Sequence, residues 1–216
     1  MGGWIENGWY LLPTAYLIGS LPFSLWISRL AAGIDIREGG SGHATTTNTI
    51  RQVGWLPGVL VLVLDLGKGY LPAYLAVRGG FPTAVIALTA ALTVVGHCWS
   101  VLAGFRGGMG LAAAGGSLLA VQPVPALITL AVLISLVLLY GHAARGSGMA
   151  GLTIAPVLWL LGFRGEVFWA ALAVGWVLAF RFYQQDWDRE YRELWLDREE
   201  EGEEGSANSE QGISEQ

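Results

Sequence analysis

The chain has 216 residues, of which 53% are hydrophobic and only 13% are charged. Soluble domains carry about 25% charged residues, so this composition excludes an ordinary water-soluble protein. Residues 1–183 hold nine Lys/Arg and five Asp/Glu, whereas residues 184–216 hold three Arg and twelve Asp/Glu. The single cysteine, Cys98, excludes an internal disulfide and a cysteine-based metal site. We therefore expect a lipid-embedded body over 1–183, followed by an acidic tail.

Apolar stretches follow one another along the body and predict membrane-spanning helices. A full span needs about 20 residues at about 1.5 Å per residue. The stretches run over 9–31, 54–77, 82–103, 111–122, 123–141, 149–163 and 167–182. The fourth is too short to span alone, and Pro123 and Pro125 separate it from the fifth, which predicts a broken helix pair. The expected fold is an all-α integral membrane protein with seven transmembrane helices, six being the alternative.

The arginines predict the orientation of these spans. With the N-terminus outside and seven spans, the outer segments hold only Arg78 and Arg164, and Lys68 lies within a span. The inner segments hold nine arginines: Arg29, Arg37, Arg51, Arg106, Arg145, Arg181, Arg189, Arg192 and Arg198. Because Lys and Arg concentrate in cytoplasmic segments, the C-terminus and the polar loops are predicted to be cytoplasmic. Residues 184–216 are expected to form an interfacial segment and then a disordered acidic tail.

The segment from Asp35 to Arg51, here called loop one, is dense in hydroxyl, amide and guanidinium groups. Gly40, Ser41 and Gly42 let the backbone turn and present N–H groups to an anion. Arginines at both ends, Arg37 and Arg51, have the planar donors that grip phosphate oxygens in pairs. Loop one is therefore a candidate phosphate-binding segment, the alternative being an ordinary polar loop.

Asp65 and Lys68 lie inside the second span at a spacing that places them on one helix face. A charged side chain in a bilayer costs about 2.5–3.5 kcal/mol on insertion scales, so such residues usually face a polar interior and have a function. The alternative is a structural ion pair. The break expected over Gly19–Ser24 is explained by Pro22, which kinks a helix, or by close helix packing.

A second glycine-dense segment, Phe105–Gly110, precedes the fourth apolar stretch and is called the Gly-rich turn below. The free N–H groups and dipole of a helix N-terminus favour an anion there. The alternative is a tight turn between helices, and His97 is either a catalytic or a packed histidine. Loop one, the turn at 104–110 and a turn expected at 142–148 all fall on the predicted inner side. They predict a cytoplasm-facing pocket for an anionic, phosphorylated small molecule.

Several motifs follow in order over residues 9–120. They are Gly19-Ser20-Leu21-Pro22-Phe23, Asp35-x-Arg37, Gly40-Ser41-Gly42, Thr47-Asn48-x-x-Arg51, Asp65-x-x-Lys68-Gly69, Gly96-His97 and Phe105-x-Gly107-Gly108-x-Gly110 with Gly115. In these motifs the chain resembles the bacterial acyl-phosphate:glycerol-3-phosphate acyltransferases. The resemblance implies seven transmembrane helices with the active site toward the cytoplasm, in a multi-pass protein of the bacterial inner (plasma) membrane.

The resemblance also implies the reaction, which is transfer of a fatty acyl group from acyl phosphate to glycerol 3-phosphate in phospholipid biosynthesis. The implied partners are these two substrates and the lipid bilayer, with no cofactor, no metal and no nucleic acid. Catalysis is assigned to Ser41, Asn48, Arg51 and His97, and a supporting role to Asp65. Phosphate or substrate binding is assigned to Arg37, Gly40, Gly42, His43, Thr47, Lys68, Arg106, Gly107, Gly108 and Gly110.

The chain departs from the family pattern at several of these positions. Met109 stands where the family has Lys, and the lost hydrogen bond to a charged group is worth about 1.5–3 kcal/mol. His43 replaces an Asn, Thr45 and Thr46 replace Gly-Ala, and residues 184–187 replace a His and Asn motif. A catalytically impaired or inactive paralogue that binds acyl phosphate or a partner is therefore the alternative function. A small transporter using Asp65 and Lys68 is a third hypothesis, although no internal repeat is visible.

Overall fold

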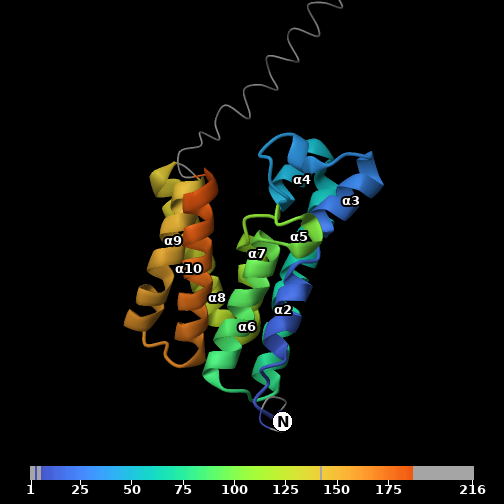
Figure 1. Cartoon of the computed structure of the whole chain (residues 1–216). Coiled ribbons are helices and arrows are strands. Elements are labelled where there is room, and N and C mark those ends of the chain that lie inside the picture. Colours follow the sequence, from blue (N-terminus) through green and yellow to red (C-terminus); the bar gives the residue numbers. More distant parts are fainter. Residues whose placement is uncertain (1–2, 4–5, 142, 187–216) are drawn as a thin grey trace, which may run out of the picture.

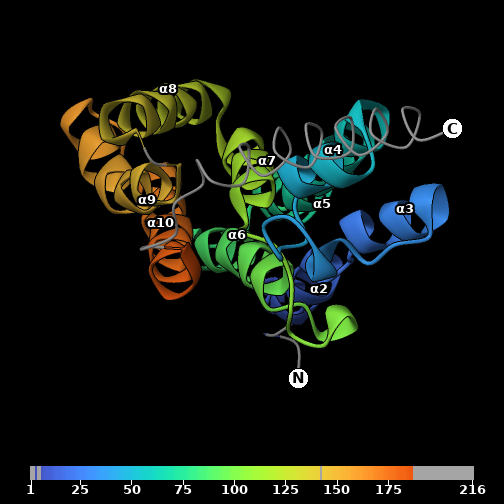
Figure 2. The same cartoon turned by 90° about the horizontal axis from the view of Figure 1, so that it is seen from above.

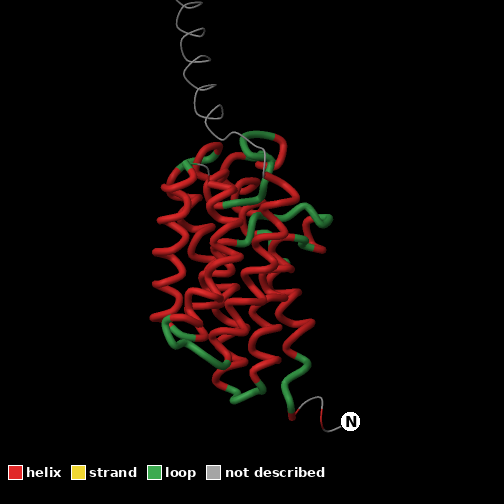
Figure 3. Tube along the Cα trace, turned by 90° about the vertical axis from the view of Figure 1, so that its left-hand side faces the viewer, coloured by secondary structure: helices red, strands yellow, loops and turns green. Residues whose placement is uncertain are grey.

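A computed structural model describes residues 3, 6–141 and 143–186, and every regular element within them is a helix (Figure 1). The tube view in Figure 3 shows the long helices side by side, with most loops gathered at the two ends. Among the described residues, five helical segments are long and apolar enough to cross a membrane, and they cover Leu11–Ala32, Trp55–Arg78, Thr83–Ala103, Pro123–Tyr140 and Glu166–Gln184. The all-α prediction is confirmed, while the seven-span count and the orientation stay predictions. The predicted tail lies outside the described residues from position 187 onward.

The first predicted span is broken where the sequence indicated. Helix α2 (Leu11–Gly19) ends before Pro22, and α3 (Phe23–Ala32) begins after it. A Cβ on Gly19 would lie 2.1 Å from the carbonyl oxygen of Thr93 in α6 (Thr83–Cys98). Glycine at this crossing lets the two backbones touch, as small residues do between membrane helices. Contact with α6 therefore holds the break between α2 and α3 in place.

Loop one contains more regular structure than the sequence analysis expected. A 3-10 turn, η1 (Ile36–Glu38), is followed by a short helix, α4 (Thr46–Gln52). Helix α4 begins there because the Thr45 side chain accepts a hydrogen bond from the Asn48 N–H, at 3.2 Å. The prediction of an irregular loop through residue 51 was wrong for this half of the segment.

The middle of the chain forms a closely packed helix pair. Helix α5 (Trp55–Arg78) packs along α7 (Leu111–Val121), which follows α6 and a 3-10 turn, η2 (Val101–Ala103). Cβ atoms on Gly69 and Gly116 would lie 2.0 Å from backbone oxygens of the facing helix. The short fourth stretch is therefore held by backbone contact with a long neighbour.

The last three helices are α8 (Pro123–Tyr140), α9 (Ala143–Leu160) and α10 (Glu166–Asp186). Extended backbone at Gln122, with Pro123 opening α8, confirms the predicted break between the fourth and fifth stretches. The turn predicted over 142–148 was wrong, because α9 already begins at residue 143. A Cβ on Gly146 would lie 2.6 Å from the Cα of Val137. This glycine therefore allows close packing of α9 on α8 instead of making a turn.

Candidate active site

Asn48 is the centre of the hydrogen bonds that shape loop one. Its side chain is fully buried, and Oδ1 accepts from the Ser41 N–H at 3.1 Å. Its Nδ2 donates to the carbonyl oxygens of Ile36 at 2.7 Å, His43 at 3.0 Å and Gly39 at 3.3 Å. One side chain thus forms hydrogen bonds to both sides of the glycine-rich bend and fixes the position of Ser41. The geometry gives Asn48 a positioning task within the predicted phosphate-binding segment.

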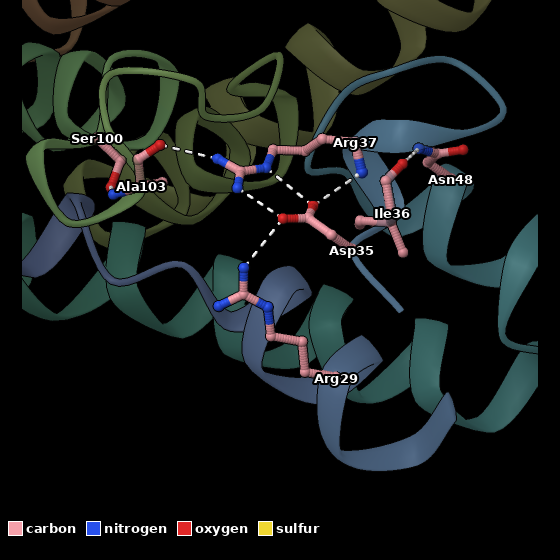
Figure 4. Close-up of polar contacts among 7 residues, drawn as sticks. All are labelled: Arg29, Asp35, Ile36, Arg37, Asn48, Ser100 and Ala103. Carbon is pink, nitrogen blue, oxygen red and sulfur yellow. Dashed lines mark hydrogen bonds and ion pairs between the residues drawn. The ribbon is translucent and has the colours of Figure 1, made fainter. Parts of the chain in front are cut away.

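A cluster of charged groups joins loop one to the segment after α6 (Figure 4). Arg37 contacts Asp35 through Nη2 at 2.6 Å and Nε at 2.9 Å, and its Nη1 donates to the carbonyl oxygen of Ala103 at 2.8 Å. Arg29 reaches the same carboxylate at 3.0 Å. The hydrogen bonds from Arg37, and then that from Arg29, hold the pKa of Asp35 well below its ordinary value, and Asp35 raises the pKa of Arg37. Each nitrogen of the Arg37 guanidinium therefore has a partner inside the protein.

Three buried ionisable side chains meet where α5, α6 and the α2–α3 break approach one another. Lys68 Nζ lies 2.8 Å from Asp65 Oδ1 and donates to the carbonyl oxygen of Leu21 at 2.8 Å. The Nδ1 atom of His97 lies 3.7 Å from the same Asp65 oxygen. The spacing in the sequence predicted that Asp65 and Lys68 share a face, and the structure confirms it. The carbonyl exposed by the break gives the buried ammonium a second partner, which offsets part of its desolvation cost.

The Gly-rich turn lies directly on His97 and on loop one. The Gly108 N–H donates to the His97 carbonyl oxygen at 3.1 Å. A Cβ on Gly108 would lie 2.2 Å from His97 Nε2 and 2.5 Å from the carbonyl oxygen of Ala44. A Cβ on Gly107 would lie 2.1 Å from the His97 carbonyl oxygen. Any side chain at these two positions would force loop one, the turn and the histidine apart. The structure therefore brings loop one and the Gly-rich turn together, as expected, whereas the third expected segment at 142–148 is not a turn.

Unpaired N–H groups lie at the start of α7 and just before it, beside this meeting point. Within the described part of the chain, the N–H groups of Met109 and Leu111 have no hydrogen-bond acceptor. Such groups at a helix N-terminus attract an anion. The Met109 side chain is only 6% exposed and packs in an apolar cluster with Val94 and Cys98. Met109 therefore offers its backbone, and not its side chain, to a ligand.

An apolar pocket of about 90 Å³ opens among α7, α8, α9 and α10. It is lined mainly by apolar side chains, among them Leu118, Leu130, Ile154 and Leu178. Leu111, the residue directly after the Gly-rich turn, lines it as well. The pocket therefore adjoins the polar meeting point and suits a hydrocarbon chain.

The remaining predicted residues lie in loop one and the Gly-rich turn. Ser41 and His43 are buried, whereas Thr47 and Arg106 are exposed. Arg51 lies in the last turn of α4 and is partly buried. Gly40, with a φ of +56°, and Gly42, with a φ of +70°, adopt the left-handed conformation that the bend requires. Loop one and the Gly-rich turn thus form one polar site. The two segments meet where Gly108 approaches the carbonyl oxygen of Ala44.

A family model described as "Glycerol-3-phosphate acyltransferase" matches residues 9–189. The chain is similar to the glycerol-3-phosphate acyltransferase of Aquifex aeolicus (strain VF5), with 35% identity over 80% of this chain and 90% of that protein. It is also similar to glycerol-3-phosphate acyltransferase 2 of Moorella thermoacetica, with 40% identity over 69% of this chain and 77% of the relative. The crystal structure of PlsY (YgiH), an integral membrane glycerol 3-phosphate acyltransferase in its glycerol 3-phosphate form, superposes with a TM-score of 0.72. That match has 35% sequence identity and covers 81% of this chain and 88% of the other.

The chain belongs to the glycerol-3-phosphate acyltransferase family. The same enzyme in its lysophosphatidic acid form matches with a TM-score of 0.70, at 33% identity over 81% of this chain and 87% of the other. The fold and the membrane setting are therefore those of this acyltransferase family.

Two buried residues beside the candidate site were not predicted from the sequence. Arg181 of α10 is 3% exposed and donates through Nε to the carbonyl oxygen of Gly108 at 3.1 Å. Its guanidinium lies over the ring of Trp99, 5.3 Å from the centroid. Arg181 entered the sequence analysis only as evidence for orientation, although a lone arginine near the end of an apolar stretch is itself a functional signal. Ser100 was also missed, and its Oγ donates to the Ser20 carbonyl oxygen at 2.5 Å.

Proposed function

We propose that this protein transfers a fatty acyl group from acyl phosphate to the first hydroxyl of glycerol 3-phosphate at the cytoplasmic face of the bacterial inner membrane. The products are lysophosphatidic acid and inorganic phosphate. The observation that carries the proposal is the junction of Gly108, His97 and Ala44 beside the unpaired N–H groups that open α7. Relatives named glycerol-3-phosphate acyltransferase support the acceptor, and the apolar pocket beside Leu111 supports an acyl donor.

In this proposal the reaction is a displacement at the acyl carbon. The hydroxyl oxygen of glycerol 3-phosphate forms a bond to the carbonyl carbon, and the bond from that carbon to the phosphate oxygen breaks. The departing phosphate takes the hydroxyl proton, so no net proton is released. The chain contributes by holding two phosphoryl groups and a hydrocarbon tail in one orientation, and by placing N–H donors near the developing negative charge.

The residues divide these tasks. Ser41 and Arg51 of loop one are proposed to contact phosphoryl oxygens, together with Lys68 and the amides of the Gly-rich turn. Burial of Asp65 next to Lys68, at 2.8 Å, keeps the ammonium in place beneath the site. His97, whose Nε2 faces Gly108, is proposed to orient the reacting carbonyl or the phosphate. The exposed Arg106 adds a cation at the rim.

The direct test is an assay of the full chain in detergent with acyl phosphate and glycerol 3-phosphate, in which mass spectrometry measures lysophosphatidic acid. The Ser41→Ala variant serves as the control, and acyl-coenzyme A is supplied in parallel as an alternative donor. Product from acyl phosphate well above the control supports the proposal. Formation of no more product than Ser41→Ala makes would refute it.

The same protein samples distinguish acyl transfer from the alternative, an inactive paralogue that only binds its ligand. Such a paralogue would gain thermal stability from acyl phosphate in a saturable way, because a ligand stabilises the state that binds it. It would do so without turnover. Nothing in the relatives favours this alternative over acyl transfer. Its motivation is the set of departures from the family pattern, chief among them Met109 in place of the family Lys.

A further inference from the structure

The buried guanidinium of Arg181 lies behind the Gly-rich turn and has no part in the reaction described above. Its Nε donates to the Gly108 carbonyl oxygen at 3.1 Å, and Nη2 approaches the Gly107 carbonyl oxygen at 3.5 Å. The other face of the group lies over Trp99. Two consecutive carbonyl oxygens of the turn are therefore directed at one cation from α10.

This arrangement fixes the direction of the N–H groups on the same peptide units. The described residues contain no cis peptide bond, and in a trans peptide the N–H points opposite to the C=O. The N–H groups of Gly108 and Met109 therefore point away from Arg181. That of Gly108 is taken by the His97 carbonyl oxygen, at 3.1 Å. That of Met109 has no acceptor within the described part of the chain.

The charge of Arg181 also matters. Hydrogen bonds from an ionised donor are roughly twice as strong as neutral ones. A carbonyl polarised in this way makes the N–H of its own peptide a better donor, by about 10–30% per bond. A neutral donor would suffice merely to tie α10 to the turn. A buried cation is costly in a membrane protein, so its placement on this turn points to an electrostatic task.

We propose that Arg181 is a positioning residue, which orients and polarises the Gly-rich turn so that the Met109 N–H donates to a phosphoryl oxygen of the substrate. This rests on the proposed function only in taking a phosphoryl group as the ligand. The turn itself carries one cationic side chain, the exposed Arg106, since Met109 is apolar and buried. Arg181 thus adds positive electrostatic potential at the buried part of the turn, through two peptide units, where the turn has no cationic side chain of its own.

Selective [15N]methionine labelling makes this visible, because the chain contains only Met1, Met109 and Met149. The Met109→Leu variant identifies the Met109 amide signal, and Met149 in α9 reports on the fold. Inorganic phosphate, and then glycerol 3-phosphate, is titrated into the full chain in detergent. We expect a saturable downfield shift of the Met109 amide and no change at Met149.

The variants then test Arg181 itself. Arg181→Met should weaken the affinity for phosphate, read from the Met109 amide shift, by at least about tenfold. Without Arg181 the turn no longer directs the Met109 N–H at the anion, and tenfold is the effect of losing a hydrogen bond to a charged group. Arg181→Lys should be intermediate, because it keeps the charge without the planar pair of donors. The matched control is Arg78→Met. Arg78 ends α5 and also lies over an aromatic ring, that of Tyr74, but at 5.9 Å and away from the turn.

An unchanged Met109 response in folded Arg181→Met would overturn the proposal and leave a structural contact only. If that variant does not fold, Arg181→Lys must bind phosphate more tightly than Arg181→Gln, and equal affinities overturn the proposal. Wild type that shows no Met109 response to either ligand also overturns it. Acyl transfer is measured on the same samples. A phosphate response without product would refute the proposed function alone, whereas product with an unaltered Arg181→Met response would refute the role of Arg181 alone.

Discussion

The two halves of the molecule are held together by different interactions. From α2 to α6, polar ties join the segments in addition to close backbone contacts at glycines, as shown by the five atoms around Asn48 and by the bond from Lys68 to Leu21. From α7 to α10, apolar side chains form one core cluster together with residues of α6, and glycines again bring helix backbones into contact. A Cβ on Gly151 of α9, for example, would lie 2.5 Å from the Gly175 carbonyl oxygen of α10. Seen from above in Figure 2, α8, α9 and α10 stand apart from α2 to α5, with α6 and α7 between them.

This difference separates two tasks. The polar half fixes individual hydrogen-bonding groups, so its residues are replaceable only by residues with the same donors and acceptors. The apolar half provides a wall and a pocket, where swaps that conserve volume are tolerated. Arg181 is the exception, since it carries a charge from the apolar half onto the Gly-rich turn. Substitutions that remove polar ties should therefore have much larger effects in the first half than in the second.

The largest effect is expected from Lys68→Met. It leaves the Asp65 carboxylate buried without its 2.8 Å partner, and removing one member of a buried pair costs about 3–5 kcal/mol. Thermal unfolding in detergent should show a large loss of stability. The double variant Asp65→Asn/Lys68→Met should recover most of it, because neither charge remains. Equal stabilities for the single and double variants would contradict the buried-pair explanation.

Asn48→Ala should come next, because it removes the Asn48 acceptor of the Ser41 N–H and one donor to each of three carbonyl oxygens that hold the bend. Other donors to these oxygens remain, among them the Gln52 side chain. Each buried group left unpaired costs about 1–3 kcal/mol, although water entering the loop recovers part of this. Limited proteolysis should detect cleavage within loop one, and acyl transfer should fall on the order of 100-fold, as about 2.7 kcal/mol of lost positioning implies.

The matched control for that variant comes from the apolar half. Ser135→Ala removes a hydroxyl that donates within α8, to the Ala131 carbonyl oxygen at 2.8 Å. This exposed bond is internal to one helix, so proteolysis and activity should remain close to wild type. A comparable loss in Ser135→Ala and Asn48→Ala would break the contrast between the halves.

Acid should weaken the tie between loop one and η2 through Asp35. Because the folded state depresses the pKa of Asp35 below its ordinary value of 3.8, the ion pair contributes stability above that pH. The contribution is lost as the pH falls from 3.8 toward the depressed pKa. The difference in unfolding free energy between wild type and Asp35→Asn should therefore be constant near neutral pH and should shrink toward zero in acid. Denaturant unfolding at a series of pH values measures it, and a difference that grows in acid would have the wrong sign.

The smallest effect is expected from Met109→Lys. The flexible stem of a lysine lets its ammonium leave the apolar cluster and reach the polar site. We expect a higher rate, with a gain of at most about tenfold, because the new interaction with phosphate is partly solvated. Steady-state kinetics against Met109→Leu measures this. A rate no higher than that of Met109→Leu would show that the backbone of the turn, and not a side chain at 109, provides the contact.

The pattern of apolar stretches and prolines predicted most of the helices, because membrane spans are defined by length and composition. It also predicted the breaks after Gly19 and at Gln122, where proline sets the backbone. It misassigned Gly146, because a glycine in a turn and a glycine at a helix contact look the same in one sequence. The difference depends on Val137, which lies on another helix.

The candidate site was predictable as a set of residues but not as a set of contacts. Loop one and the Gly-rich turn were expected to meet, and Ala44 and Gly108 do so. The sequence could not show that Arg37 would be engaged by Asp35 and Ala103, because one of these partners is 66 positions away. Arg181 was missed for a similar reason, since its partner Gly108 is 73 positions away. The assigned roles of the site residues in catalysis stay predictions.

Helix α8 couples the apolar pocket to the thickness of the surrounding bilayer. Only 6% of this span is buried in the protein, and at 18 residues it is about 27 Å long, slightly shorter than a typical hydrocarbon core of about 30 Å. Most of its surface therefore faces lipid, and a bilayer of different thickness can change its tilt. Because Leu130 of α8 forms part of the pocket wall, the width of the apolar pocket proposed for the acyl chain should depend on the membrane in which the protein resides. Chain-length preference measured in short-chain and long-chain lipid vesicles should differ for the same polypeptide.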